Sequence, residues 1–185
     1  MEALDALLNR VSVARLTDPA PDGAQREALF QAALRAPDHG QLRPWRFLTI
    51  EGEGRDRLGE LFAEAVERKG DATSKALDKA RAMPLRAPLL IVVIACLQDH
   101  YKVPKSEQRL AAGCAAHGIL LAAHAQGIGA VWRTGDLAFD DHVHQGLGMA
   151  ENEEVIGYLY VGTPENQPRP APVLETAEFV QGWGG

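Results

Sequence analysis

The sequence predicts one domain in which helices cover a β-sheet, of the α/β or α+β class. Its 185 residues are enough to build a full hydrophobic core. Residues 89–97 are apolar on both faces of any strand, which places this strand in the middle of a covered sheet. Residues 105–126 form the longest expected helix, about 33 Å at 1.5 Å per residue. The other strands are separated by helices, which gives this class and leaves the strand order open.

The remaining elements follow from periodicity, caps and chain breakers. Residues 3–9 place four apolar side chains on one helical face. Asp22 and Gln25 form a capping box that starts a helix reaching about Leu34. We also expect strands at 45–51, 129–132 and 155–161, and helices at 55–69, 73–83 and 140–147. Residues 1–185 are expected to be a single domain, in which the proline-rich residues 163–185 form an extended C-terminal tail.

Composition excludes several classes of protein. A net charge of −6 argues against a nucleic-acid binder, because neutralising phosphates needs a basic face. No stretch reaches the ~18 apolar residues of a membrane span, and the acidic start has no basic region of a signal peptide. We therefore expect a cytoplasmic protein without nucleic-acid or membrane partners. Cys96 and Cys114 lie among apolar residues and are expected to be reduced, buried thiols.

The common catalytic and metal motifs are missing. His117 and His124 lie about two helical turns apart, and His142 and His144 point to different sides of a helix. No cysteine pair or His-Glu-x-x-His accompanies them, so no metal site is expected. There is no Gly-x-Ser-x-Gly nucleophile motif. The glycines at 127–129 follow a helix instead of preceding one, which excludes a dinucleotide-binding phosphate loop.

Three groups of residues remain: Arg10 with Ser12, the polar loop 38–45, and the run Trp132-Arg133-Thr134. Taken alone, Arg10 can be a cation that stabilises a helix C-terminus, and Trp132 can be a core aromatic. Arginine also offers forked, permanently charged donors that suit a phosphate or a carbonyl-rich ring. The order of the three groups along the chain, around a long helix of small residues, matches a known arrangement.

That arrangement resembles the FMN-dependent nitroreductase family over nearly the whole chain, most closely its short, single-domain NAD(P)H nitroreductases. The residues that carry the resemblance are Asn9-Arg10-Val11-Ser12, Arg35-Ala36-Pro37-Asp38-His39, Pro44-Trp45, the run 125–135 (AQGIGAVWRTG) and the run 157–164 (GYLYVGTP). The resemblance implies an α+β, three-layer fold with helices around a central, mostly antiparallel sheet. It also implies an intertwined homodimer with two FMN molecules at the subunit interface.

The same resemblance implies the site and the reaction. Arg10, Val11 and Ser12 would contact FMN, Arg35 and His39 would approach it from the partner subunit, and Trp132, Arg133 and Thr134 would line the isoalloxazine, with a backbone N–H facing flavin N5. NAD(P)H would reduce the flavin, which would then reduce a nitroaromatic, quinone-like or other electron-poor small molecule by a ping-pong mechanism. The cofactor performs the chemistry, so no catalytic side chain is expected.

The chain departs from the family pattern at several positions. Val11 stands where relatives often have a second arginine, and Ala14 stands where they commonly have a cation near flavin N1. That role could pass to Arg15 or Arg35. Arg43 is an additional cation, for which we favour a surface role over contact with an anionic substrate, and Arg169 could reach the FMN phosphate.

Two alternative functions stay open. One is a flavin-dependent dehalogenase or dehydrogenase of the same fold, for which residues 52–83 are the only candidate lid. The other is a flavin-binding dimer without turnover.

Overall fold

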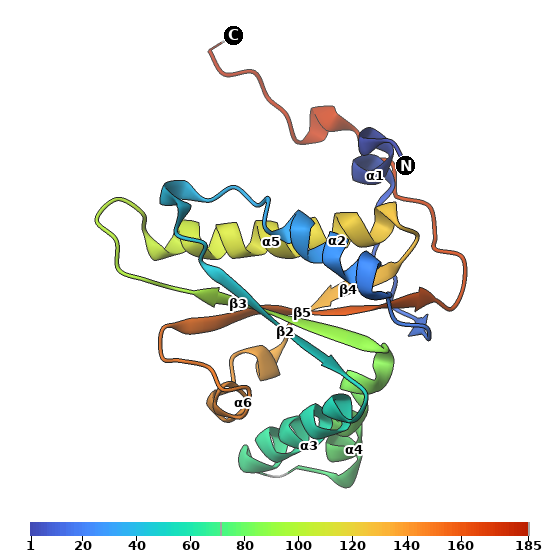
Figure 1. The fold of residues 1–185 in the computed structure, drawn as a ribbon, viewed down its shortest axis with the longest axis vertical. Helices are drawn as coiled ribbons and strands as arrows, with labels where there is room; N and C mark the ends of the chain where they lie inside the picture. Colours follow the sequence, from blue (N-terminus) through green and yellow to red (C-terminus); the bar gives the residue numbers. More distant parts are fainter. Residues whose placement is uncertain (71, 185) are drawn as a thin grey trace.

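The protein is a three-layer sandwich with a β-sheet in the middle (Figure 1). In this computed structural model, residues 1–70 and 72–184 are described. Asp71, inside the candidate lid, and Gly185, at the end of the predicted tail, lie outside them. One face of the sheet carries α2 (Gly23–Ala33) and α5 (Lys105–Ala125), and the other carries α3 (Glu53–Arg68), α4 (Ser74–Ala82) and α6 (Asp141–Gly146). The short helix α1 (Ala3–Asn9) lies apart, near the end of α5 and the start of the tail.

The sheet contains β1 (Leu16–Thr17), β2 (Trp45–Glu51), β3 (Leu89–Cys96), β4 (Gly129–Arg133) and β5 (Glu153–Pro164). Its order is β1-β5-β3-β2, and β4 also pairs with β5. Every strand pairing within the described residues is antiparallel. The predicted α+β fold with a mostly antiparallel sheet is therefore confirmed.

The central position of β3 matches its apolar sequence. Its residues from Leu89 to Ala95 are fully buried, because β2 and β5 flank the strand and helices cover both faces. Its alternate side chains enter two separate cores. Leu90, Val92 and Ile94 pack toward α3 and α4, whereas Leu89, Ile91 and Val93 pack toward α2 and α5.

Helix α5 begins after Pro104 and ends at Ala125, and Gly127, two residues later, adopts a left-handed φ of +73°. Its small residues allow α2 to approach closely. A Cβ on Gly118 would lie 2.9 Å from the Ala32 carbonyl oxygen. One prediction is wrong here: Cys114 is exposed, because it lies on the side of α5 that faces away from the sheet.

The C-terminal segment differs from the prediction at its start. β5 continues through Thr163 and Pro164, two residues into the predicted tail, because they pair with Thr17 and Leu16. A two-residue strand such as β1 leaves no periodic signal in the sequence. Beyond β5 the tail is extended apart from a short 3-10 helix at Thr176–Glu178 (Figure 1).

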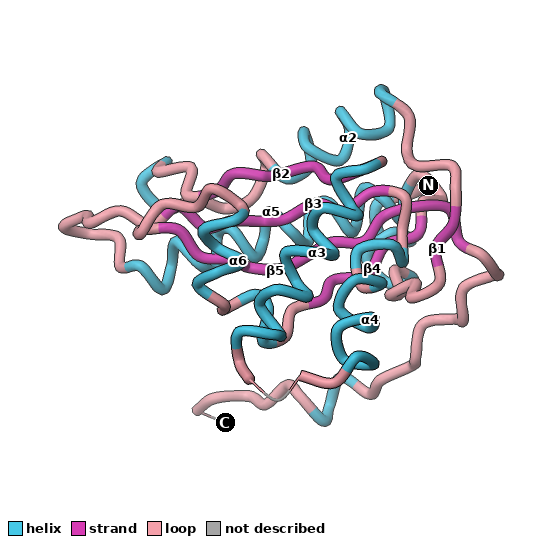
Figure 2. Tube along the Cα trace, turned by 90° about the horizontal axis from the view of Figure 1, so that it is seen from below, coloured by secondary structure: helices cyan, strands magenta, loops and turns pink. Residues whose placement is uncertain are grey.

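Helices α3 and α4, the α3–α4 pair, pack against each other and close the core that Leu90, Val92 and Ile94 enter. Phe62 on α3 is buried, and its ring meets the Tyr158 ring edge-on at 5.5 Å between centroids. The two helices touch at Gly59, where a Cβ would lie 2.5 Å from the Arg81 carbonyl oxygen. In Figure 2, which is seen from below, this pair lies in front of the sheet. The candidate lid is therefore largely part of the core.

Candidate functional site

The segment after α1 places Arg10 beside the start of β4. The backbone N–H of Val13 donates to the Ala130 carbonyl oxygen at 2.9 Å, so this segment borders the outer edge of β4 at its N-terminal end. Arg10 and Val11 line a cavity of about 210 Å³ there. Ser12 is exposed beside them. The structure thus brings the first group of predicted residues to the N-terminal end of β4.

This first cavity contains a second polar group that the sequence reasoning did not single out as a ligand. His124, in the last turn of α5, lines it, and its Nε2 is buried without a hydrogen-bond partner in the described part of the chain. A buried polar atom without a partner is costly, and it therefore suggests that a ligand or water completes it. Pro168 of the tail also lines the cavity, which places the start of the tail, and Arg169 next to it, close to Arg10.

The residues at the other end of β4 point to both faces of the sheet, as strand alternation requires. Trp132 packs on the α5 side, where its Nε1 donates to the Ile156 carbonyl oxygen at 3.2 Å. It lies directly over Gly157, and any Cβ there would overlap its indole nitrogen. Trp132 is therefore partly a core aromatic, while Thr134, just after the strand, is exposed.

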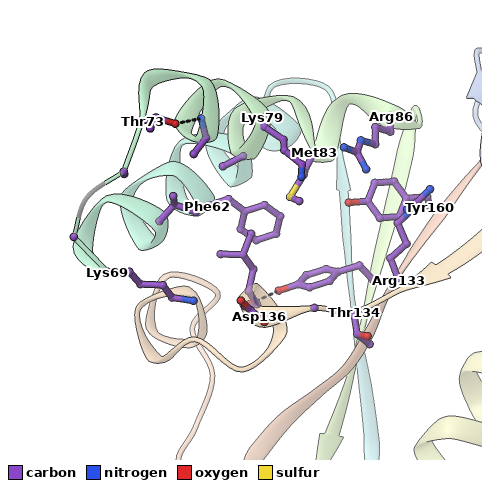
Figure 3. Close-up of a pocket in the computed structure, with 18 residues that line it drawn as sticks. Phe62, Lys69, Thr73, Lys79, Met83, Arg86, Arg133, Thr134, Asp136 and Tyr160 are labelled. Carbon is purple, nitrogen blue, oxygen red and sulfur yellow. Dashed lines mark hydrogen bonds between the residues drawn. The ribbon is translucent and has the colours of Figure 1, made fainter.

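Arg133 points to the opposite face, into a larger cavity of about 800 Å³ between the α3–α4 pair, the end of β4 and the middle of β5 (Figure 3). Its guanidinium carbon lies 5.9 Å from the centroid of the Tyr160 ring. Its Nε is buried and finds no hydrogen-bond partner among the residues that the structure describes. Thr134 also lines this second cavity.

Three further cations reach the same cavity: Lys69, which lies 3.7 Å from Asp140, and two that make no ion pair with another described residue. Lys79 on α4 and Arg86, just before β3, line it together with Tyr160. Burial raises the pKa of Tyr160, and the positive charges of Arg86 and Arg133 oppose that rise. The sequence predicted an ordinary helix at 73–83 and no role for Arg86, so neither Lys79 nor Arg86 was among the predicted site residues. The repeated basic residues between 75 and 86 were the only signal available.

Arg35 and His39 do not line either of these cavities. Arg35 is exposed at the end of α2. His39 Nδ1 lies 2.7 Å from Glu107 Oε2, at the first turn of α5. The loop is held by Asp38, whose carboxylate accepts hydrogen bonds from the backbone N–H groups of Leu42 and Arg43 at 3.2 and 2.6 Å. In the single chain, Arg10 and Val11 therefore lie at one end of β4 and Trp132 to Thr134 at the other. Arg35 and His39 line neither cavity.

Several other cations and histidines lie on the surface or contact other residues of the protein. Arg15 approaches Glu165 on the surface at 3.9 Å, and the Arg43 side chain is exposed. His142 Nε2 lies 2.8 Å from Glu64 Oε2, and His144 Nε2 lies 2.8 Å from the Ala138 carbonyl oxygen. Within residues 1–70 and 72–184, no group of three or more His, Cys, Asp or Glu side chains is arranged to hold a metal ion. No described helix is long and apolar enough to cross a membrane.

A family model described as the nitroreductase family matches residues 7–163, which include both ends of β4 and the loop with Arg35 and His39. The chain belongs to the nitroreductase family. YdjA of Escherichia coli strain K12, provisionally named an NAD(P)H nitroreductase, is 43% identical over 94% of this chain and 98% of its own. The prediction of an oxidoreductase of this family is therefore confirmed.

Solved structures share the fold of this nitroreductase. A nitroreductase-like family protein from Bacillus cereus has a TM-score of 0.84 and 24% identity, covering 100% of this chain and 97% of its own. A nitroreductase-type protein from Desulfovibrio desulfuricans, solved in complex with FMN, has a TM-score of 0.75 and 22% identity, covering 97% and 95%.

Proposed function

We propose that this nitroreductase is an FMN-dependent NAD(P)H oxidoreductase whose flavin lies along the outer edge of β4. The observation that carries this proposal is the pair of cavities at the two ends of that strand. One contains Arg10 and His124, whose Nε2 has no partner among the described residues, and the other contains Arg133 and Thr134. A five-residue strand spans about 17 Å, a length comparable to extended FMN.

The residues present fit the two ends of this cofactor. Arg10, His124 and the nearby Arg169 would hold the phosphate, because cationic and N–H donors form strong hydrogen bonds to anionic oxygen. Val11 and Ser12 would face the ribityl chain. Trp132 would line the isoalloxazine on the α5 side, and Arg133 would approach its edge from the other face of the sheet.

The backbone of β4 supports this placement. In an antiparallel strand, the N–H and C=O of one residue point to the same side and alternate between neighbours. The Ala130 carbonyl points outward to Val13, so the N–H of Trp132 also points outward, and the same alternation assigns that direction to Thr134. An outward N–H at Thr134 would donate to flavin N5.

When bound, FMN supplies the atom that accepts a hydride from NAD(P)H and passes it to the second substrate. The protein contributes orientation and charge. Trp132, held by its own hydrogen bond to Ile156, would fix the plane of the isoalloxazine ring. Arg133 would stabilise the negative charge that develops in this partly desolvated site. No side chain has to exchange a proton for the hydride transfer itself. Nitroaromatic, quinone-like and other electron-poor molecules are the proposed acceptors.

We further propose a homodimer in which Arg35 and His39 of each chain complete the other chain's site. The apolar face of α1 supports this, because Leu4, Leu7 and Leu8 are exposed in the single chain. Leu110 on α5 and the tail residues Val173, Leu174, Phe179, Val180 and Trp183 are exposed as well. An amphipathic helix and an apolar tail need a partner surface to bury these side chains.

The absorption spectrum of the purified, desalted protein tests the function. We expect visible flavin bands that bleach when NADPH is added without oxygen. Absence of flavin, even after incubation with FMN, would contradict the proposal. Flavin that stays oxidised with both NADH and NADPH would instead favour the flavin-binding dimer without turnover.

A further inference from the structure

The larger cavity carries positive charge in an acidic protein. Among its described lining residues, Lys79, Arg86 and Arg133 make no ion pair with another described residue. A fourth cation, Lys69, lies 3.7 Å from Asp140. Asp136 is the only carboxylate in this described lining. A cleft lined by one sign of charge raises the local concentration of ligands of the opposite sign.

One of these cations has a buried donor atom that no described residue satisfies. Arg133 Nε is buried without an acceptor in the described part of the chain. Figure 3 shows Arg133, Arg86 and Tyr160 together at one end of the cavity, with Lys79 nearby. A charged donor group that is removed from water is stabilised when an anionic oxygen accepts a hydrogen bond from it. This end of the cavity is therefore suited to an anion.

The rest of the wall suits a flat, apolar ring. Phe62, Val66, Met83 and Tyr158 form it, and the Tyr158 hydroxyl donates to the Leu137 carbonyl oxygen at 3.2 Å instead of projecting into the cavity as a free donor. The volume of about 800 Å³ lies in the range of small-molecule sites. A ligand that matches both parts combines an aromatic ring with an anionic group.

The position of the cavity connects it to the reaction. Thr134, which faces flavin N5 in the proposed function, also lines this cavity, and Arg133 precedes it directly. A charge recognised by Arg133 lies next to the backbone that would face the reacting atom. In NAD(P)H a ribose separates the nicotinamide from the nearest phosphate. The charge therefore fits the second substrate better than the dinucleotide.

We propose that this cavity is the acceptor site and that it selects aromatic carboxylates, whose carboxylate contacts Arg86, Arg133 and Lys79. The identity of the ligand as an electron acceptor rests on the proposed function. For a nitro acceptor, one turnover is R–NO₂ + NAD(P)H + H⁺ → R–NO + NAD(P)⁺ + H₂O. NAD(P)H loses the hydride, and one nitro oxygen leaves as water.

The test compares 4-nitrobenzoate with 4-nitrobenzamide, which has nearly the same shape but no charge. Calorimetry on the FMN-loaded protein without NAD(P)H measures both Kd values. We expect the carboxylate to bind at least 10-fold more tightly. The double variant Lys79→Gln/Arg86→Gln should bring the two Kd values within about 2-fold, whereas Lys75→Gln, a cation of the same helix that does not line the cavity, should leave the preference unchanged.

Three results would overturn the proposal: equal affinity for the two compounds, a preference that survives in the double variant, or carboxylate binding that FMN abolishes. The last would mean that the flavin itself fills the cavity. A double variant that changed only the ratio of NADPH to NADH use would also overturn the proposal, because it would show that the cations recognise the dinucleotide. Flavin retention, read from the visible spectrum, is measured separately. A protein without flavin would contradict the proposed function, while calorimetry on that protein would still report the carboxylate preference.

Discussion

The ion pair between Arg46 on β2 and Glu153 at the start of β5 makes the stability of this fold depend on pH in a predictable window. Arg46 Nε donates to Glu153 Oε1 at 2.6 Å, and its Nη2 donates to Oε2 at 2.6 Å. The Ala150 N–H and the Cys96 thiol donate to the same carboxylate at 3.0 and 3.4 Å. These contacts clamp β2 and β5 across the end of β3.

The magnitude follows from the pKa of Glu153. Its side chain is only 10% exposed, and the hydrogen bonds from Arg46, with those from Ala150 and Cys96, lower its pKa from 4.5 to about 2 despite the opposing effect of burial. At about 1.4 kcal/mol per pKa unit, this contributes about 3 kcal/mol to stability at neutral pH. Because the folded-state pKa is lowered, the contribution is complete above about pH 5 and disappears as the pH falls toward 2. At pH 3, about 2 kcal/mol of it is lost.

Urea unfolding of the wild type and of Glu153→Gln at pH 7 and pH 3 measures this contribution. The glutamine keeps the shape and removes the charge, so the difference in unfolding free energy should shrink by about 2 kcal/mol between the two pH values. Glu151→Gln, an exposed neighbour, is the control. A difference for Glu153→Gln that is the same at both pH values would refute the reasoning.

Three further predictions concern the site and the assembly. Arg10→Ala should lower FMN affinity by about 1.5–3 kcal/mol, through the loss of a charge-assisted hydrogen bond; unchanged affinity in a flavin titration would remove Arg10 from the site. Gly157→Ala should displace Trp132, lower stability by about 1–3 kcal/mol and weaken flavin retention. Gly113→Ala, whose Cβ would meet Trp132 at an ordinary 3.8 Å, should not. Light scattering should give about twice the 20.0 kDa chain mass, and replacing both Leu4 and Leu8 with glutamate should yield monomers that lose FMN, since cofactor and partner stabilise each other; a wild-type monomer with full flavin would contradict the shared site.

Local sequence determined the individual elements because their signals act over a few residues. The capping box of Asp22 and Gln25 forms as expected, with mutual hydrogen bonds of 2.9 and 2.8 Å. β2 has the predicted bounds, since the Pro44-Trp45 start and Gly52 limit it on both sides. The uniformly apolar β3 could only be a central strand. The family motifs also lie in such local runs, which is why the family could be recognised from the sequence.

Tertiary structure decided which of these runs meet. Val13 borders the outer edge of β4 at Ala130 through a backbone hydrogen bond between segments more than a hundred residues apart. Strand alternation, set by pairing with β5, sends Trp132 and Arg133 to opposite faces and so to different surroundings. The same packing places Lys79 and Arg86 beside Arg133. The positions of these three residues along the chain do not predict that they meet. It also leaves Cys114 on the exposed side of α5, although its apolar neighbours in the sequence predicted that it would be buried.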